Sequence, residues 1–171
     1  MFIGSSLSVS FNKLPASIEE FTALPQLSDL TKPQNTAALL IAAFELYVHD
    51  PEAGVAAINM LKGPVKLSNH EIAFLKDRFC DKPYLPRAYF KGAAPQNNYT
   101  PLQPYTLEFE PDQRPQDLGE GYTRLYITTA GADSPRPIVL RKKASAPEWF
   151  VWEYPAIVMS IRVPAEQDPW A

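Results

Sequence analysis

The chain has 171 residues, of which 46% are hydrophobic and 20% charged, and these proportions exclude wholesale disorder. Its 16 basic and 19 acidic side chains give a net charge of -3, which argues against a general binder of nucleic acid or anionic membranes. A single cysteine excludes a disulfide framework and any zinc site built on paired cysteines.

The N-terminal region begins without the features of a secretory leader. No basic residue precedes Lys13, and serines interrupt the first apolar residues. The most apolar stretch, residues 37–44, is far shorter than the roughly 20 residues that cross a bilayer. We expect no leader, no membrane span and a cytoplasmic location, with which the free thiol of Cys80 agrees.

The first predicted elements are a strand and a short helix. Leu7, Val9 and Phe11 alternate with serines, which is the period of a half-buried strand. Ser17 is followed three residues later by Glu20, a spacing that caps a helix N-terminus.

A second helix is predicted over about 33–49. Residues 37–44 are apolar throughout, so no face of this helix suits water. We expect it at the centre of the core, with helices on one side and a sheet on the other. Asp50 should cap a third helix, and Ser68 a fourth that ends before Pro83.

The remainder is proline-rich and then strand-like. Alternating apolar residues predict strands near 105–110, 122–129, 137–143 and 148–154, with a further extended segment at 157–163. We therefore predict one α+β domain over 1–171, with N-terminal helices packed on one face of a curved antiparallel sheet of four to six strands. Its helical half spans about 15–83, a proline-rich connection about 84–104, the sheet half about 105–163 and a tail 164–171.

Catalytic and metal-binding patterns are missing from the sequence. His70-Glu71 begins a helix as in zinc enzymes, but position 74 is Phe74 where a second histidine is needed. Cys80 is interpreted as a small buried hydrophobic residue rather than a nucleophile. Neither common glycine-rich nucleotide motif occurs. We predict no catalytic residue, no metal site and no cofactor, and the balance leans away from an enzyme.

Glu108 and Glu110 share one face of a predicted strand, at a separation that glycosidase carboxylates also show. Arg124 and Arg141 are expected on the same sheet face in neighbouring strands. Cross-strand ion pairs account for all four residues without chemistry.

Basic and aromatic residues gather in the last predicted strands, a mixture typical of protein-binding surfaces. Alternation places Phe150, Trp152 and Tyr154 on one strand face, with Trp149 and Val151 on the other. The candidate binding residues are Asp133, Arg136, Arg141, Trp149, Trp152 and Tyr154. The C-terminal Asp168-Pro169-Trp170 is expected to dock either on the sheet or in a partner subunit.

Several segments together resemble a known family. They include Leu14-Pro15-x-x-Ile18-Glu19-Glu20-Phe21, Tyr89-Phe90-Lys91-Gly92-Ala93, Asn97-Asn98-Tyr99-Thr100-Pro101, Ala132-Asp133-Ser134-Pro135-Arg136-Pro137 and Trp149-Phe150-x-Trp152-Glu153. With the closing Asp168-Pro169-Trp170, they resemble a small bacterial family labelled only as a domain of unknown function. That resemblance implies no activity, cofactor or catalytic residue.

The order of elements also resembles, more loosely, the cone-shaped folds of the nuclear transport factor 2 type. This likeness implies a small-molecule pocket between sheet and helices, although the N-terminal strand and the proline-rich connection depart from the pattern.

Three functions follow as hypotheses. The first is a non-enzymatic interaction or accessory module, immunity-like, that binds another protein or a second copy through the aromatic and arginine-bearing sheet rim. The alternative is a small-molecule-binding or enzymatic pocket between sheet and helices. The third, a nucleic-acid contact through residues 136–143, is disfavoured by the acidic chain.

Overall fold

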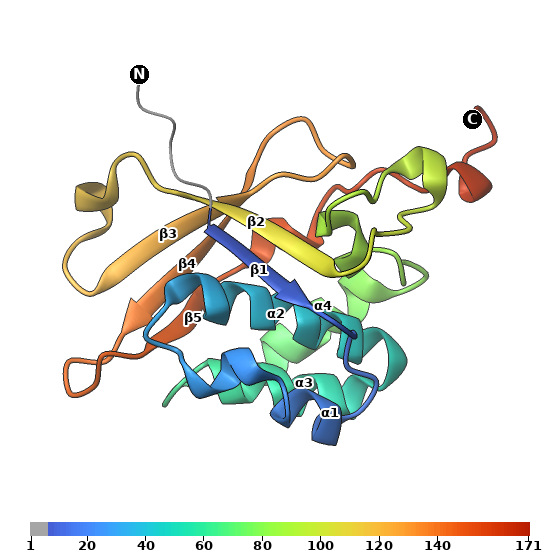
Figure 1. The fold of residues 1–171 in the computed structure, drawn as a ribbon. Helices are drawn as coiled ribbons and strands as arrows, with labels where there is room; N and C mark the ends of the chain where they lie inside the picture. The colour runs from blue at the N-terminus through green and yellow to red at the C-terminus, as the bar shows by residue number, and fades with distance from the viewer. Residues whose placement is uncertain (1–6) are drawn as a thin grey trace.

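The computed structural model describes residues 7–171, which form an open antiparallel sheet covered by helices (Figure 1). The five strands follow chain order, β1-β2-β3-β4-β5, and every neighbouring pair is antiparallel. The strands are β1 Leu7–Phe11, β2 Tyr105–Pro111, β3 Tyr122–Ile127, β4 Arg136–Lys142 and β5 Trp149–Glu153. The helices are α1 Ile18–Thr22, α2 Pro33–His49, α3 Pro51–Leu61 and α4 Asn69–Phe79. The predicted α+β class and its antiparallel sheet are confirmed.

Helix α2 is the central layer of the fold. One side contacts β1, β3, β4 and β5, while the other contacts α1 and α3 (Figure 1). Every residue from 36 to 47 is buried, as the continuous apolar run predicts. The packing against α3 is close, since a Cβ added at Gly54 would lie 2.3 Å from the Cα of Tyr47.

The predicted helix starts are confirmed by their capping bonds. The Ser17 hydroxyl accepts a hydrogen bond from the Glu20 amide at 3.1 Å, and the Asp50 carboxylate accepts one from the Ala53 amide at 3.2 Å. At α4 the capping box is complete, with Glu71 and Ser68 exchanging bonds of 3.1 and 2.9 Å.

The proline-rich connection packs as an ordered segment with its own small cluster. The rings of Tyr84 and Tyr99 are stacked at 5.5 Å, and both are buried. The hydroxyl of Tyr99 donates to the carbonyl of Arg162 at 2.6 Å, and that of Tyr89 donates to the carbonyl of Ile157. These bonds tie the connection to the segment that follows β5.

Two sequence predictions are wrong. Residues 157–163 form no strand; the chain makes a 3-10 turn at Pro155–Val158 and then continues irregularly. The carbonyls of this segment accept hydrogen bonds from side chains rather than from a neighbouring strand; Arg136 donates to three of them, those of Ala156, Met159 and Ser160. Cys80 is exposed rather than buried, since it lies at the C-terminal cap of α4.

Residues 1–6, on which the expectation of no leader largely depends, lie outside the described residues. Within residues 7–171, none of the helices combines the length and apolar character needed to cross a membrane.

Candidate cationic pocket

An irregularity in the β4–β5 ladder sets the position of Trp152. Leu140 pairs with Val151, but Val139, the residue before it in β4, pairs with Glu153. Trp152 is therefore the extra residue of a β-bulge, a feature that redirects side chains. Val151 and Tyr154 are both buried while Trp152 is exposed, so strict alternation fails here.

The basic residues at the end of β4 lie over aromatic rings. The Arg141 guanidinium is 4.7 Å from the ring centre of Trp152 and 5.3 Å from that of Tyr122. The ammonium groups of the next two residues lie over rings in the same way, Lys142 at 5.5 Å from Trp149 and Lys143 at 5.6 Å from Phe150. Attraction between a cation and the ring face restrains each charge while leaving its N–H groups free to donate.

A buried lysine from the opposite side completes this cationic group. Lys62 follows α3, and its side chain is only 6% exposed. Its ammonium has one ion pair, 3.4 Å from Glu71, and lies 5.8 Å from the ring centre of Tyr154. A buried ammonium with three donors and one long ion pair is incompletely compensated.

These side chains surround a hollow of about 380 Å³ between the β4–β5 hairpin and the turn after α3. We call it the cationic pocket; it is lined by Lys62, Pro64, Val65, Arg141, Lys142, Lys143, Ala144, Phe150, Val151 and Trp152. Four of these residues are basic and none is acidic. The turn fits closely beneath the hairpin, because a Cβ at Gly63 would lie 3.0 Å from the Phe150 ring.

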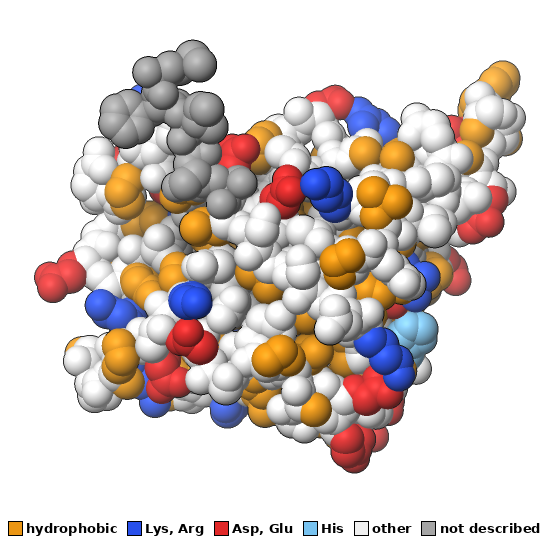
Figure 2. All heavy atoms as spheres, viewed as in Figure 1, with side chains coloured by type: hydrophobic (Ala, Val, Ile, Leu, Met, Phe, Trp, Pro, Cys, Tyr) orange, Lys and Arg blue, Asp and Glu red, His pale blue; other side chains and the backbone are white. Residues whose placement is uncertain are grey.

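Charge is concentrated in this pocket although the chain is acidic overall. The face in Figure 2 intersperses basic and acidic side chains and presents no broad basic surface. A hollow bordered by several cations attracts anionic groups more strongly than a mixed surface does. Chemically, the pocket can neutralise an anion and offer apolar contact beside it.

The predicted binding residues are distributed over several environments. Arg141 and Trp152 line the cationic pocket, and Trp149 holds Lys142 beside it. Tyr154 is buried against Phe44, at a ring distance of 5.8 Å. Burial, followed by the nearby Glu71 carboxylate, raises the pKa of Tyr154.

Asp133 and Arg136 lie apart from the pocket. Asp133 forms an exposed ion pair with Arg162. Arg136 donates to the carbonyls of Ala156, Met159 and Ser160, which gives it a structural role in holding the chain after β5.

Lys62 was missed by the sequence reasoning. A lysine near the C-terminal end of a helix usually faces water and interacts favourably with the helix dipole. The position of Lys62 in the sequence therefore gave no sign that its side chain is buried. Its surroundings include the ring of Tyr154 and the β4–β5 hairpin, which come about eighty to ninety residues further along the chain.

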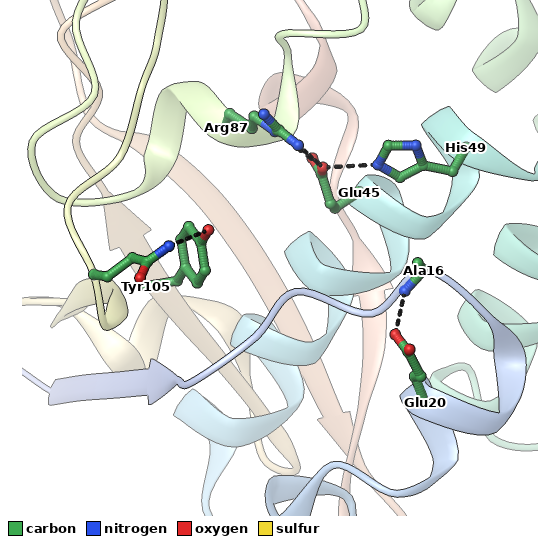
Figure 3. A network of polar contacts seen from close by, with 7 residues as sticks. Ala16, Glu20, Glu45, His49, Arg87 and Tyr105 are labelled. Carbon is green, nitrogen blue, oxygen red and sulfur yellow. Dashed lines mark hydrogen bonds and ion pairs between the residues drawn. The ribbon is translucent and has the colours of Figure 1, made fainter.

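A second polar cluster joins α2 to the proline-rich connection (Figure 3). The buried Glu45 Oε1 accepts from Arg87 Nε at 3.0 Å and from Arg87 Nη2 at 2.9 Å, and lies 3.2 Å from His49 Nε2. The hydrogen bonds and charge of Glu45 raise the pKa of Arg87. The Arg87 guanidinium neutralises the one carboxylate buried in α2, so the cluster is explained by the cost of burying that charge.

The expected ion pairs of Glu108 and Glu110 with Arg124 and Arg141, across neighbouring strands, are wrong. Glu108 pairs with Lys91 at 3.5 Å, and Arg124 pairs with Asp112 at 2.8 Å. The sequence did not place Lys91 or Asp112 beside the sheet, and Arg141 is held by aromatic rings instead. Among the described residues, no group of three or more metal-ligating side chains comes together.

Comparison with protein families shows to which family the chain belongs. A family model described as "Domain of unknown function (DUF6935)" matches residues 13–165. The chain belongs to this family. No curated protein and no solved structure matches it. Membership in DUF6935 confirms the resemblance to a family of unknown function, whereas the looser likeness to nuclear transport factor 2 folds is not confirmed.

Proposed function

We propose that this chain is a non-enzymatic binding module that holds an acidic segment of a partner protein in the cationic pocket. The observation that carries the proposal is the buried, incompletely paired Lys62 at a hollow whose other cations are held on aromatic rings. Ordered donors bind an anion at a smaller entropic cost than free surface lysines do.

The rim of the pocket favours a protein segment as the ligand. Val65 and Trp152 are 56% and 38% exposed, so apolar surface borders the charged hollow. An acidic segment with an apolar or aromatic residue would cover this surface while its carboxylates meet the cations. Nucleic acid is less suited, because the rest of an acidic chain would repel a long polyanion.

The cationic pocket does not lie between the sheet and the helices, where the cone-like order of elements implies a pocket. Between the sheet and α2 the side chains are fully buried and belong to one core cluster. The cationic pocket instead lies at the sheet edge, where a segment of a partner can enter from outside. An accessory role in a bacterial cytoplasm is part of the proposal, and an exposed free thiol at Cys80 suits a reducing compartment.

The test is binding of a fluorescein-labelled, glutamate-rich peptide with a central tryptophan, followed by anisotropy. We expect binding that weakens as salt increases and a lysine-rich counterpart that does not bind. Lys143→Gln should weaken the peptide several-fold, whereas Lys91→Gln, which removes a charge outside the pocket, should not. Equal binding by both variants, or no binding of the acidic peptide, would overturn the proposal.

A further inference from the structure

The C-terminal tail carries features that complement the cationic pocket. Trp170 is 92% exposed, so it docks on no part of its own chain. A large aromatic side chain left in water is a common mark of a protein contact site. Its neighbours Glu166 and Asp168 are acidic, and residues 163–171 contain no lysine or arginine.

The chain holds this tail in a defined position. The Glu166 amide donates to Asn98 Oδ1 at 2.9 Å, in a 3-10 turn at Ala165–Gln167 that contacts the turn Pro95–Asn97. Beyond it, the Asp168 carboxylate accepts a hydrogen bond from the Trp170 amide at 2.9 Å. An ordered tail loses less conformational entropy when it binds than a free one does.

The tail cannot reach the cationic pocket of its own molecule. Figure 1 shows the C-terminus projecting at the opposite end of the protein from the β4–β5 hairpin. The bond between Glu166 and Asn98 fixes the tail at that end. Any occupant of the pocket with this sequence must therefore come from a second copy of the chain.

We propose that the cationic pocket of one protomer binds the tail of a second protomer, residues 166–171. Glu166 and Asp168 meet the ammonium and guanidinium groups of the pocket, and Trp170 covers the exposed Val65 and Trp152 at its rim. This inference rests on the proposed function, because it names a partner for the same site. Since pocket and tail are different surfaces, each link is heterologous, and two protomers can close a pair only by exchanging tails reciprocally.

The first experiment is sedimentation of the full chain at increasing concentration and at two salt concentrations. We expect reversible self-association that salt weakens. Trp170→Ala leaves the fold unaffected because the side chain is exposed, and it should weaken association at least tenfold. Glu110→Lys, an acidic-to-basic change on an exposed residue of β2, should associate like the parent chain.

The decisive experiment mixes two charge-reversed variants. One carries Glu166→Lys and Asp168→Lys in the tail, and the other carries Arg141→Glu and Lys143→Glu in the pocket. Each should be monomeric alone, and far-ultraviolet circular dichroism checks that each is folded. Their mixture should form a one-to-one complex, because one intact tail then meets one intact pocket. Association of the tail variant alone, or a mixture that stays monomeric although both variants are folded, would overturn the inference.

The glutamate-rich peptide separates this inference from the proposed function. If the peptide binds the pocket but the parent chain stays monomeric to about millimolar concentration, the tail is not the occupant and the binding function stands. If neither the peptide nor a second copy binds, both proposals fail.

Discussion

Replacing Lys62 by methionine separates a ligand-binding role from a structural one. Lys62 and Lys91 each form one ion pair of similar length, 3.4 Å to Glu71 and 3.5 Å to Glu108. Their side chains are 6% and 62% exposed, so only Lys62 loses its hydration when the chain folds. Lys91→Met is therefore a matched control for the loss of one lysine charge.

We expect Lys62→Met to leave the free energy of unfolding unchanged or to raise it by up to about 2 kcal/mol, since burying an ammonium costs more than one long ion pair returns. Glu71 is not left buried and unpaired, because it stays partly exposed and still accepts from the Ser68 amide at 2.9 Å. Lys91→Met should change stability by less than about 0.5 kcal/mol.

Lys62→Met should, in contrast, weaken the binding of the acidic peptide. Losing one charged hydrogen bond, worth about 1.5–3 kcal/mol, corresponds to a loss of affinity of roughly tenfold to a hundredfold. Urea denaturation gives the stability and anisotropy gives the affinity of the same samples. A loss of more than about 2 kcal/mol of stability with unchanged peptide affinity would refute the argument and make Lys62 a structural residue.

Three further predictions concern the fold. Gly63→Ala and Gly119→Ala both place a side chain at positive φ, +65° and +90°, at a cost of about 1 kcal/mol; Gly63→Ala should lower the melting temperature more, because only there would the new Cβ meet an aromatic ring, and equal losses would contradict this. Arg87→Met should cost about 3 kcal/mol in urea denaturation and Glu45→Gln only about 1, because the first leaves a buried carboxylate without its cation; the reverse order would show that the pairing is unimportant. Burial raises the pKa of Tyr99 to about 12, so the stability that its neutral form provides is complete below pH 10 and falls by about 1.4 kcal/mol per pH unit as the pH rises toward 12. Tyr99→Phe should show a shallower alkaline loss in denaturation curves between pH 9 and 12, and identical slopes would exclude this cause.

The helical half was predictable because its signals are local. The apolar run of α2 and the caps at Ser17, Asp50 and Ser68 each depend on residues within a few positions of one another. Strand alternation likewise predicts β1 and β2, where one face is buried and the other is not.

The site was only partly predictable because its geometry depends on distant contacts. The sequence indicates aromatic and basic residues in β4 and β5. Alternation places Trp152 and Tyr154 on the same strand face, but the bulge at Trp152 leaves Trp152 exposed and Tyr154 buried. Lys62 enters the pocket from a turn whose sequence resembles an ordinary helix end. Likewise, the exposure of Trp170 follows from where the chain fastens its tail, at Asn98, and no pattern within the tail encodes that.

We propose the cationic pocket as the place where an acidic protein segment binds. The most direct measurement is a two-dimensional ¹H–¹⁵N spectrum of the full chain recorded while the glutamate-rich peptide is added. We expect chemical-shift changes concentrated at Lys62–Val65 and Arg141–Trp152, including the indole N–H of Trp152, that saturate and are reversed by salt. Saturating changes centred on other residues, or no change up to millimolar peptide, would contradict it.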